Sequence, residues 1–160
     1  MKYNIKVTKN TQSRLADLDF DNIPFGTVFS DHMFVADYID GEWVNCEVKP
    51  FGNLELSPAN LAIHYGQSLF EGMKATKGSD GNPYLFRPEE HALRINASAE
   101  RMCMPAIPES LFLDALHILI GLDNKWIPPT EGSALYIRPF LFATDEMFRV
   151  KVSDTYKFII

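Results

Sequence analysis

An arginine within an apolar segment is the first residue that could do chemistry. Arg138 stands in the apolar run 134–142. In a strand, period-two alternation places Tyr136 and Phe140 on the same face as this arginine. A guanidinium beside a phenol can bind a carboxylate, because its planar donors match the two oxygens. Burying an unpaired charge in such a run is costly, so we expect an anionic partner, which is either a ligand or an Asp or Glu of the same chain.

A second arginine, Arg94, lies in a predicted helix at the margin of its apolar stripe, from which it could reach over a cleft. Its planar donors suit a phosphate or a carboxylate. The alternative is an ordinary solvated arginine on a helix face. The same two interpretations apply to Arg87 and Arg101.

The strand-like run 69–76 places a bare glycine, Gly72, beside aromatic and polar side chains. A glycine within a strand indicates a bulge or the close approach of another group, such as a cofactor or a substrate. Phe25, Tyr65 and Phe70 are aromatic candidates for the wall of a site, and core packing is the alternative for each. Alternation predicts one face with Leu69, Glu71, Met73 and Ala75 and another with Phe70, Gly72, Lys74 and Thr76.

Other patterns that carry chemistry are missing from the sequence. No Ser-His-Asp set, Walker loop or Gly-x-Gly-x-x-Gly fingerprint is present. The four histidines, His32, His64, His91 and His117, are scattered without the spacing of metal ligands, so we expect no metal.

The bulk composition indicates one globular domain. At 160 residues, 46% of them apolar and 22% charged, the chain can form a real core. The net charge is −6 and no basic stripe follows the sequence, so nucleic acid is excluded as an expected partner.

The cysteines and the apolar runs bear on where the protein works. Cys46 and Cys103 belong to no Cys-x-x-Cys pattern and fit a reduced, cytoplasmic protein. No run reaches the roughly 20 apolar residues of a membrane span, and the first 20 residues lack the apolar core of a secretory signal. We therefore expect no membrane association.

The first half of the chain reads mainly as strands. Alternation over 27–38 runs into an Asp40-Gly41 turn and predicts a hairpin, and a further irregular strand is expected at 48–56. Residues 57–60 form a predicted turn. The runs 69–76 and 84–86 flank a loop of turn-forming residues and predict a second antiparallel hairpin.

Two adjacent helices follow. Pro88 and two glutamates begin a helix that extends to about Met102, with an inward stripe of Ala92, Ile95, Ala99 and Met102. A second helix runs from about Glu109 to Leu122, with Gly121 well placed to end it. Its buried residues should be Leu111, Phe112, Ala115, Leu116, Leu119 and Ile120.

The order of elements predicts an α+β fold, because strands flank the two helices and 133–144 and 156–160 also read as strands. We expect a two-layer α/β sandwich, a mainly antiparallel sheet with two helices packed on one face. The chain stops within the last strand, at Ile160, which predicts a fragment of a longer protein; a natural edge strand is the alternative.

Taken together, these segments resemble branched-chain amino acid aminotransferases, pyridoxal 5'-phosphate enzymes of fold type IV. The Tyr-Gly-x-x-x-Phe-Glu-Gly pattern at 65–72 is typical of the superfamily. The Tyr-Ile-Arg-Pro pattern at 136–139, with the Phe-Gly and Asp-His-Met segments at 25–33, favours the branched-chain group. The resemblance covers most of the chain and implies that residues 1–160 form the N-terminal small domain.

The resemblance implies a function and site residues. It implies a transferase that moves the amino group of leucine, isoleucine or valine to 2-oxoglutarate, with branched-chain amino acids, glutamate and 2-oxo acids as partners, and a homodimer or another homo-oligomer. Arg94 would bind the cofactor phosphate. The substrate pocket would be lined by Phe25, Tyr65, Phe70, Tyr136 and Arg138.

The family's Schiff-base lysine belongs to a C-terminal domain that is absent from this chain. We expect Lys74, the tempting substitute, to be an ordinary strand lysine, and the chain to be inactive alone. Alternatives to this function are a D-amino acid transaminase, aminodeoxychorismate lyase, and a non-catalytic interaction module on the same scaffold.

Overall fold

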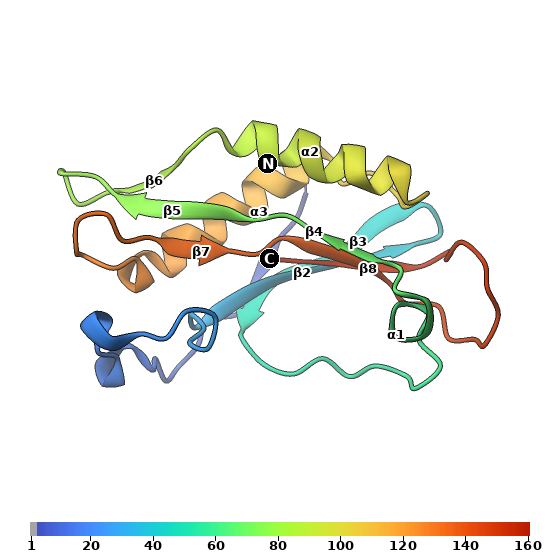
Figure 1. The fold of residues 1–160 in the computed structure, drawn as a ribbon, viewed down its shortest axis with the longest axis horizontal. Coiled ribbons are helices and arrows are strands. Elements are labelled where there is room, and N and C mark those ends of the chain that lie inside the picture. Colours follow the sequence, from blue (N-terminus) through green and yellow to red (C-terminus); the bar gives the residue numbers. More distant parts are fainter. Residues whose placement is uncertain (1–2) are drawn as a thin grey trace.

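The computed structural model describes residues 3–160 and is α+β, as the sequence predicts, but its strands form two sheets (Figure 1). In the six-stranded sheet the order is β1 (Lys6–Val7), β3 (Glu42–Pro50), β2 (His32–Ile39), β9 (Tyr156–Ile159), β8 (Phe140–Ala143) and β4 (Ser68–Phe70). In the three-stranded sheet the order is β6 (Pro83–Leu85), β5 (Met73–Lys77) and β7 (Leu135–Ile137). Only the pairing of β1 with β3 is parallel among these described strands.

The first hairpin is confirmed, and its turn shows why it forms. Asp40 and Gly41 both have positive φ, 52° and 86°, which suits a two-residue turn between twisted strands. The expected separate strand at 48–56 is wrong. Its first residues belong to β3, and after Phe51 donates a hydrogen bond to the Asp31 carbonyl (2.8 Å) the chain leaves the sheet.

Both predicted helices are confirmed, as α2 (Pro88–Arg101) and α3 (Glu109–Leu122). All six residues expected on the inner side of α3 are buried, as are Ala92, Ile95 and Ala99 of α2. Met102 is 44% exposed, so that expectation is wrong, because α2 ends before it and Cys103 turns the chain with φ of 55°. Gly121 does not end α3, which continues to Leu122 and is followed by a buried Asp123.

The shorter helices are α1 (Leu61–Tyr65) and three 3-10 turns. The predicted turn at 57–60 is present, and its last residue, Asn60, caps α1 by accepting hydrogen bonds from the backbone N–H groups of Ala62 and Ile63. The 3-10 turns are η1 (Leu15–Asp17), η2 (Phe20–Asn22) and η3 (Asn124–Trp126).

Two strand runs that alternation treats as continuous are each broken, and both change sheets at the break. The run 69–76 divides into β4 and β5, and the run 133–144 divides into β7 and β8. β4 pairs with β8 in the large sheet, while β5 pairs with β7 in the small one. The Glu71 N–H donates to the Pro139 carbonyl (2.8 Å) between the two breaks. We call residues 71–72 and 138–139 the crossing.

The main core lies between the helices and the strands. Figure 1 shows α2 along the top, α3 crossing behind β5 and β7, and the segments 8–31 and 51–60 below the strands. α3 packs against β2 and β3, and α2 packs against α3 and β4. The largest fully buried side chains include Phe34 of β2, Phe112 of α3 and Phe158 of β9, whose ring contacts the other two, so this part of the core lies between α3 and the large sheet. Away from the helices, the segment 8–31 approaches the crossing through the contact of Phe25 with Tyr136.

Candidate functional site

Arg138 stands at the crossing and is exposed, so the expectation of a buried charge is wrong. Its position between β7 and β8 takes it out of both ladders, which is why it reaches solvent. Its guanidinium lies over the Phe70 ring, 4.1 Å from the centroid, and donates from Nε and Nη2 to the Tyr136 hydroxyl at 3.2 and 2.9 Å. No carboxylate pairs with it among residues 3–160. The cation is therefore held by neutral groups.

Phe25 and Gly72 complete the surroundings of Tyr136. The Phe25 ring packs edge-on against the Tyr136 ring, with centroids 5.6 Å apart. On Gly72, a β-carbon would lie 2.5 Å from the Tyr136 hydroxyl oxygen. The close approach expected at this glycine is thus made by a tyrosine of the same chain. The structure therefore brings together four of the predicted site residues, Phe25, Phe70, Tyr136 and Arg138.

Arg94 forms a bidentate ion pair with Glu71, whose side chain is only 8% exposed. Its Nε and Nη2 donate to the two carboxylate oxygens at 2.5 and 2.6 Å. Burial raises the pKa of Glu71, but hydrogen bonds from Arg94, from the Gly72 N–H and from His91 outweigh it, so this pKa lies below its usual value. The same contact raises the pKa of Arg94. The pair is charged across the ordinary pH range.

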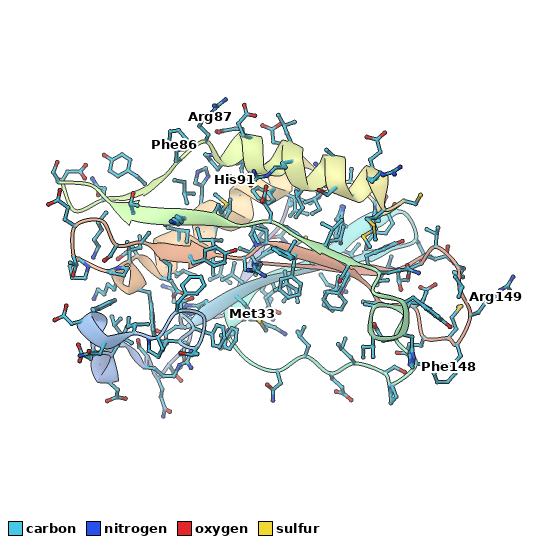
Figure 2. All side chains as sticks on the ribbon, viewed as in Figure 1. Met33, Phe86, Arg87, His91, Phe148 and Arg149 are labelled. Carbon is cyan, nitrogen blue, oxygen red and sulfur yellow. The ribbon has the colours of Figure 1, made fainter. Side chains whose placement is uncertain are left out.

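His91 is the third member of this cluster, and sequence reasoning missed it together with Glu71. Its Nδ1 lies 3.3 Å from Glu71 Oε2 and 3.3 Å from Arg94 Nη2. Figure 2 shows His91 directed from α2 toward the strands, whereas Arg87 at the start of α2 points away from them. The i, i+3 spacing of His91 and Arg94 on one helix face was the signal that could have found it.

The remaining predicted site residues are placed less centrally. Tyr65, at the end of α1, is 40% exposed and lies near His64, with ring centroids 6.2 Å apart, and no contact joins it to Arg138 in the described part of the chain. Arg87 pairs with Glu90 at the surface, and Arg101 is exposed at the end of α2. Lys74 is an exposed lysine of β5, as expected.

Two cavities meet at Tyr136 and Arg138. One, of about 550 Å³, reaches to Phe25, Trp126 and Leu135. The other, of about 490 Å³, reaches to Phe51 and Phe140. A site of this size with aromatic walls and a single cation suits a small acid with an apolar part.

The wall that carries Phe25 is anchored by a buried polar network. Asp31, which immediately precedes β2, accepts hydrogen bonds from the Trp126 indole (3.0 Å), the Ser13 hydroxyl (2.5 Å) and the Arg14 N–H (3.2 Å). The Arg14 guanidinium donates to the Phe29 and Ser30 carbonyls at 2.8 and 3.0 Å. Residues 14 and 30 are thereby held together, which fixes both ends of the segment that carries Phe25.

The Arg94 cluster fits a phosphate group. Glu71 occupies Nε and Nη2, while Nη1 makes no hydrogen bond within residues 3–160, and the arginine side chain is 64% exposed. A guanidinium that is fixed on one edge and open on the other can donate to phosphate oxygens. The Arg138 cluster in turn can receive a carboxylate.

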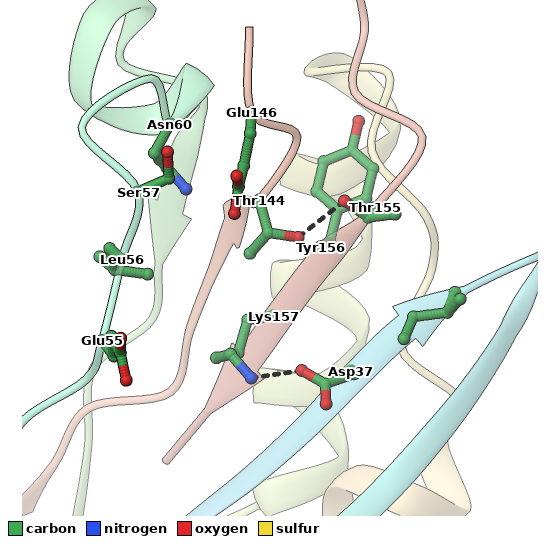
Figure 3. Close-up of a pocket in the computed structure, with 11 residues that line it drawn as sticks. Asp37, Glu55, Leu56, Ser57, Asn60, Thr144, Glu146, Thr155, Tyr156 and Lys157 are labelled. Carbon is green, nitrogen blue, oxygen red and sulfur yellow. Dashed lines mark hydrogen bonds and ion pairs between the residues drawn. The ribbon is translucent and has the colours of Figure 1, made fainter.

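A separate cavity of about 250 Å³ lies between Glu55, Asn60 and Glu146 (Figure 3). Lys157 and Asp37, which also line it, already form an ion pair, and the Thr144 hydroxyl donates to that of Thr155. None of the predicted site residues lines it.

Within the described residues, no group of three or more His, Cys, Asp or Glu side chains is arranged to hold a metal ion. No helix in residues 3–160 has the length and apolar character needed to cross a bilayer.

The fold is an α+β domain with two exposed arginines at the crossing, and comparison with known proteins shows which proteins it is similar to. The chain is 43% identical over 151 residues to branched-chain-amino-acid aminotransferase 2 of Bacillus subtilis, covering 94% of this chain. It spans 42% of the length of that relative. No family model matches the chain. The identity to this relative confirms the resemblance to branched-chain aminotransferases that the motifs predict.

Solved structures give the same result. The crystal structure of the Escherichia coli branched-chain amino acid aminotransferase matches with a TM-score of 0.59 and 25% identity, over 81% of this chain and 38% of that chain. The branched-chain amino acid aminotransferase from Thermobaculum terrenum, in its PLP form, matches with a TM-score of 0.55 and 18% identity, over 79% and 38% of the two chains. The second match supports the fold alone.

Proposed function

We propose that this chain is the N-terminal small domain of a branched-chain amino acid aminotransferase. The complete protein would transfer the amino group of leucine, isoleucine or valine to 2-oxoglutarate with pyridoxal 5'-phosphate. The observation that carries this proposal is Arg138, an exposed cation on an aromatic wall without a carboxylate partner in the described chain. The relatives' names supply the reaction.

The residues of this chain would bind and orient, while the cofactor supplies the electron sink that makes amino transfer possible. Arg94 would hold the phosphate through its free Nη1 edge, with Glu71 fixing the opposite edge. Lys74 has no part in this scheme, because we place the lysine that attaches the cofactor in the portion of the relatives that this chain does not span.

The substrate pocket must alternately accept an aliphatic side chain and the second carboxylate of glutamate. Phe25 and Phe70 would provide the apolar wall, together with Tyr65. When glutamate enters, Arg138 would bind its side-chain carboxylate. When leucine enters, the Tyr136 hydroxyl would hold the guanidinium, as it does in this structure. A neutral hydroxyl binds a guanidinium more weakly than a carboxylate does, so the glutamate carboxylate can displace the Tyr136 hydroxyl from Arg138, and the hydroxyl can return when glutamate leaves.

Two measurements test this proposal. The complete protein should transaminate leucine with 2-oxoglutarate, and absence of that activity would overturn the assigned reaction. When the chain 1–160 is treated with pyridoxal phosphate and borohydride, no single lysine should be labelled in preference to the other exposed lysines, and the chain should not turn over leucine. Selective labelling of one lysine together with leucine turnover by this chain alone would contradict the placement of the lysine elsewhere. We further propose that the complete protein is cytoplasmic and forms a homo-oligomer. Analytical ultracentrifugation of the complete protein would check the oligomeric state.

A further inference from the structure

The Tyr136 side chain occupies the space beside Gly72 in which a β-carbon would stand. The register pairs Met73 with Ile137 and Lys74 with Tyr136, so the Tyr136 ring leans past its own pairing partner toward the crossing. A β-carbon on Gly72 would lie 2.5 Å from the hydroxyl oxygen and 3.2 Å from Cζ. Real β-carbons essentially never come within 3.0 Å of another heavy atom, so any other residue at this position must displace the ring.

The Gly72 backbone is held in place, whereas the Tyr136 ring is partly exposed and is the side of the contact that can move. The Gly72 N–H is held by Glu71 Oε1 at 2.9 Å, and the Glu71 N–H by the Pro139 carbonyl at 2.8 Å. On the other side, the Phe25 ring packs against the Tyr136 ring. An added methyl group would therefore push the tyrosine hydroxyl instead of being absorbed by the backbone.

The hydroxyl that would be displaced is the group that holds Arg138. It accepts from Nη2 at 2.9 Å and from Nε at 3.2 Å. Restoring an ordinary contact of 3.4 Å to a new β-carbon requires a movement of about 1 Å, enough to lose hydrogen bonds of these lengths. The guanidinium would then keep its contacts with the Phe70 and Tyr136 rings but lose the acceptor that orients it.

We propose that Gly72 is a specificity-determining residue. Its bare α-carbon sets the Tyr136 hydroxyl where it orients Arg138 toward an acidic side chain, without itself touching that group. This inference rests on the proposed function, because it concerns the same substrate pocket. An acidic substrate needs the oriented cation, whereas an aliphatic one needs mainly the aromatic wall.

The experiment uses the complete protein with cofactor bound and compares Gly72→Ala with the wild type. We expect kcat/KM for glutamate to fall about ten- to hundredfold, mainly through KM, and that for leucine to fall less than about threefold. Binding of glutarate and of 4-methylpentanoate, measured by calorimetry, should show the same selectivity. An equal loss for acidic and aliphatic ligands would overturn the proposal.

A second variant tests the route through the tyrosine. Tyr136→Phe removes the displaced oxygen, so adding Gly72→Ala to it should cause little further loss of glutarate affinity. Additive losses would show that Gly72 acts in another way. Because glutarate binding does not require amino transfer, a wild type that binds glutarate selectively yet does not transaminate leucine would refute the proposed function and leave this inference standing.

Gly78→Ala is the matched control. A β-carbon there would lie 2.5 Å from Cε2 of Tyr84, a clash of the same size against another tyrosine. Gly78 follows β5 in the same small sheet and lines neither cavity next to Arg138. It should change the stability of the protein but not the ratio of glutarate to 4-methylpentanoate affinity. A change of that ratio equal to the one in Gly72→Ala would contradict the specific role of Gly72.

Discussion

Arg94 and Arg138 both adjoin the crossing, yet they are held in different ways. Arg94 faces a buried carboxylate, so its charge is compensated and its geometry is fixed. Arg138 rests on an aromatic ring and a phenol, so its charge is uncompensated. A fixed arginine with spare donors suits an anion that stays bound, whereas a cation held by neutral groups suits an anion that enters and leaves.

Glu71→Gln is expected to have the largest effect on stability. The glutamine keeps the shape but removes the charge and places amide hydrogens against the donors of Arg94 and Gly72. We expect a loss of about 1–3 kcal/mol in the free energy of unfolding, limited by the exposure of Arg94. Urea denaturation measures it, and a loss below about 0.5 kcal/mol would show that the pair is not structural.

Arg138→Met should affect recognition instead of folding. The methionine can still pack on Phe70, but no cation remains for an acidic side chain. In the complete protein we expect kcat/KM for glutamate to fall about tenfold or more and that for leucine to change less than about threefold. Steady-state kinetics with both amino acids measures this, and equal losses would contradict the dual-substrate role of Arg138.

The pH dependence of stability sharpens the contrast between the two arginines. Because the folded pKa of Glu71 is lowered, its stabilisation is fully present above the pKa of an unfolded glutamate, about 4.3, and is lost as the pH falls through the folded value. The difference in unfolding free energy between wild type and Glu71→Gln should therefore shrink below pH 4. Other carboxyl groups with lowered pKa, such as Asp31, cancel in this difference. A difference independent of pH between 3 and 6, measured by urea titration, would contradict the charged pair.

Glu90→Gln should have the smallest effect and serves as the surface counterpart of Glu71→Gln. Glu90 pairs with Arg87 at 2.8 Å, but the two side chains are 56% and 63% exposed. Exposed pairs of this kind contribute about 0.5 kcal/mol or less. A loss as large as that of Glu71→Gln in the same urea experiment would mean that burial is not what separates the two pairs.

Local signals in the sequence were sufficient for much of the fold. Asp40-Gly41 predicts its turn through the backbone conformation that both residues adopt, and Pro88 and the apolar stripe of 109–122 predict the two helices. The crossing could not be predicted, because alternation continues with the same period through Glu71 and Gly72. The change of sheet depends on a hydrogen bond to Pro139, which lies far away in sequence.

The candidate site was predictable where it depends on residues close together in the sequence, and not where it depends on contacts between distant segments. The types and spacing of Tyr136 and Arg138 indicated a carboxylate site, and the structure leaves this arginine without an acidic partner in residues 3–160. The pairing of Arg94 with Glu71 joins a helix to a strand break 23 residues earlier, which no local pattern encodes. The roles of Arg94 and Tyr65 in binding remain predictions.

The shared crossing has a mechanical consequence. Each of the two strand runs belongs to both sheets, and they are tied to each other between Glu71 and Pro139. Any sliding of one sheet past the other would shift Glu71, the partner of Arg94, together with Arg138. The proposed phosphate site and the proposed carboxylate site would therefore move as one unit and keep their alignment when either sheet shifts.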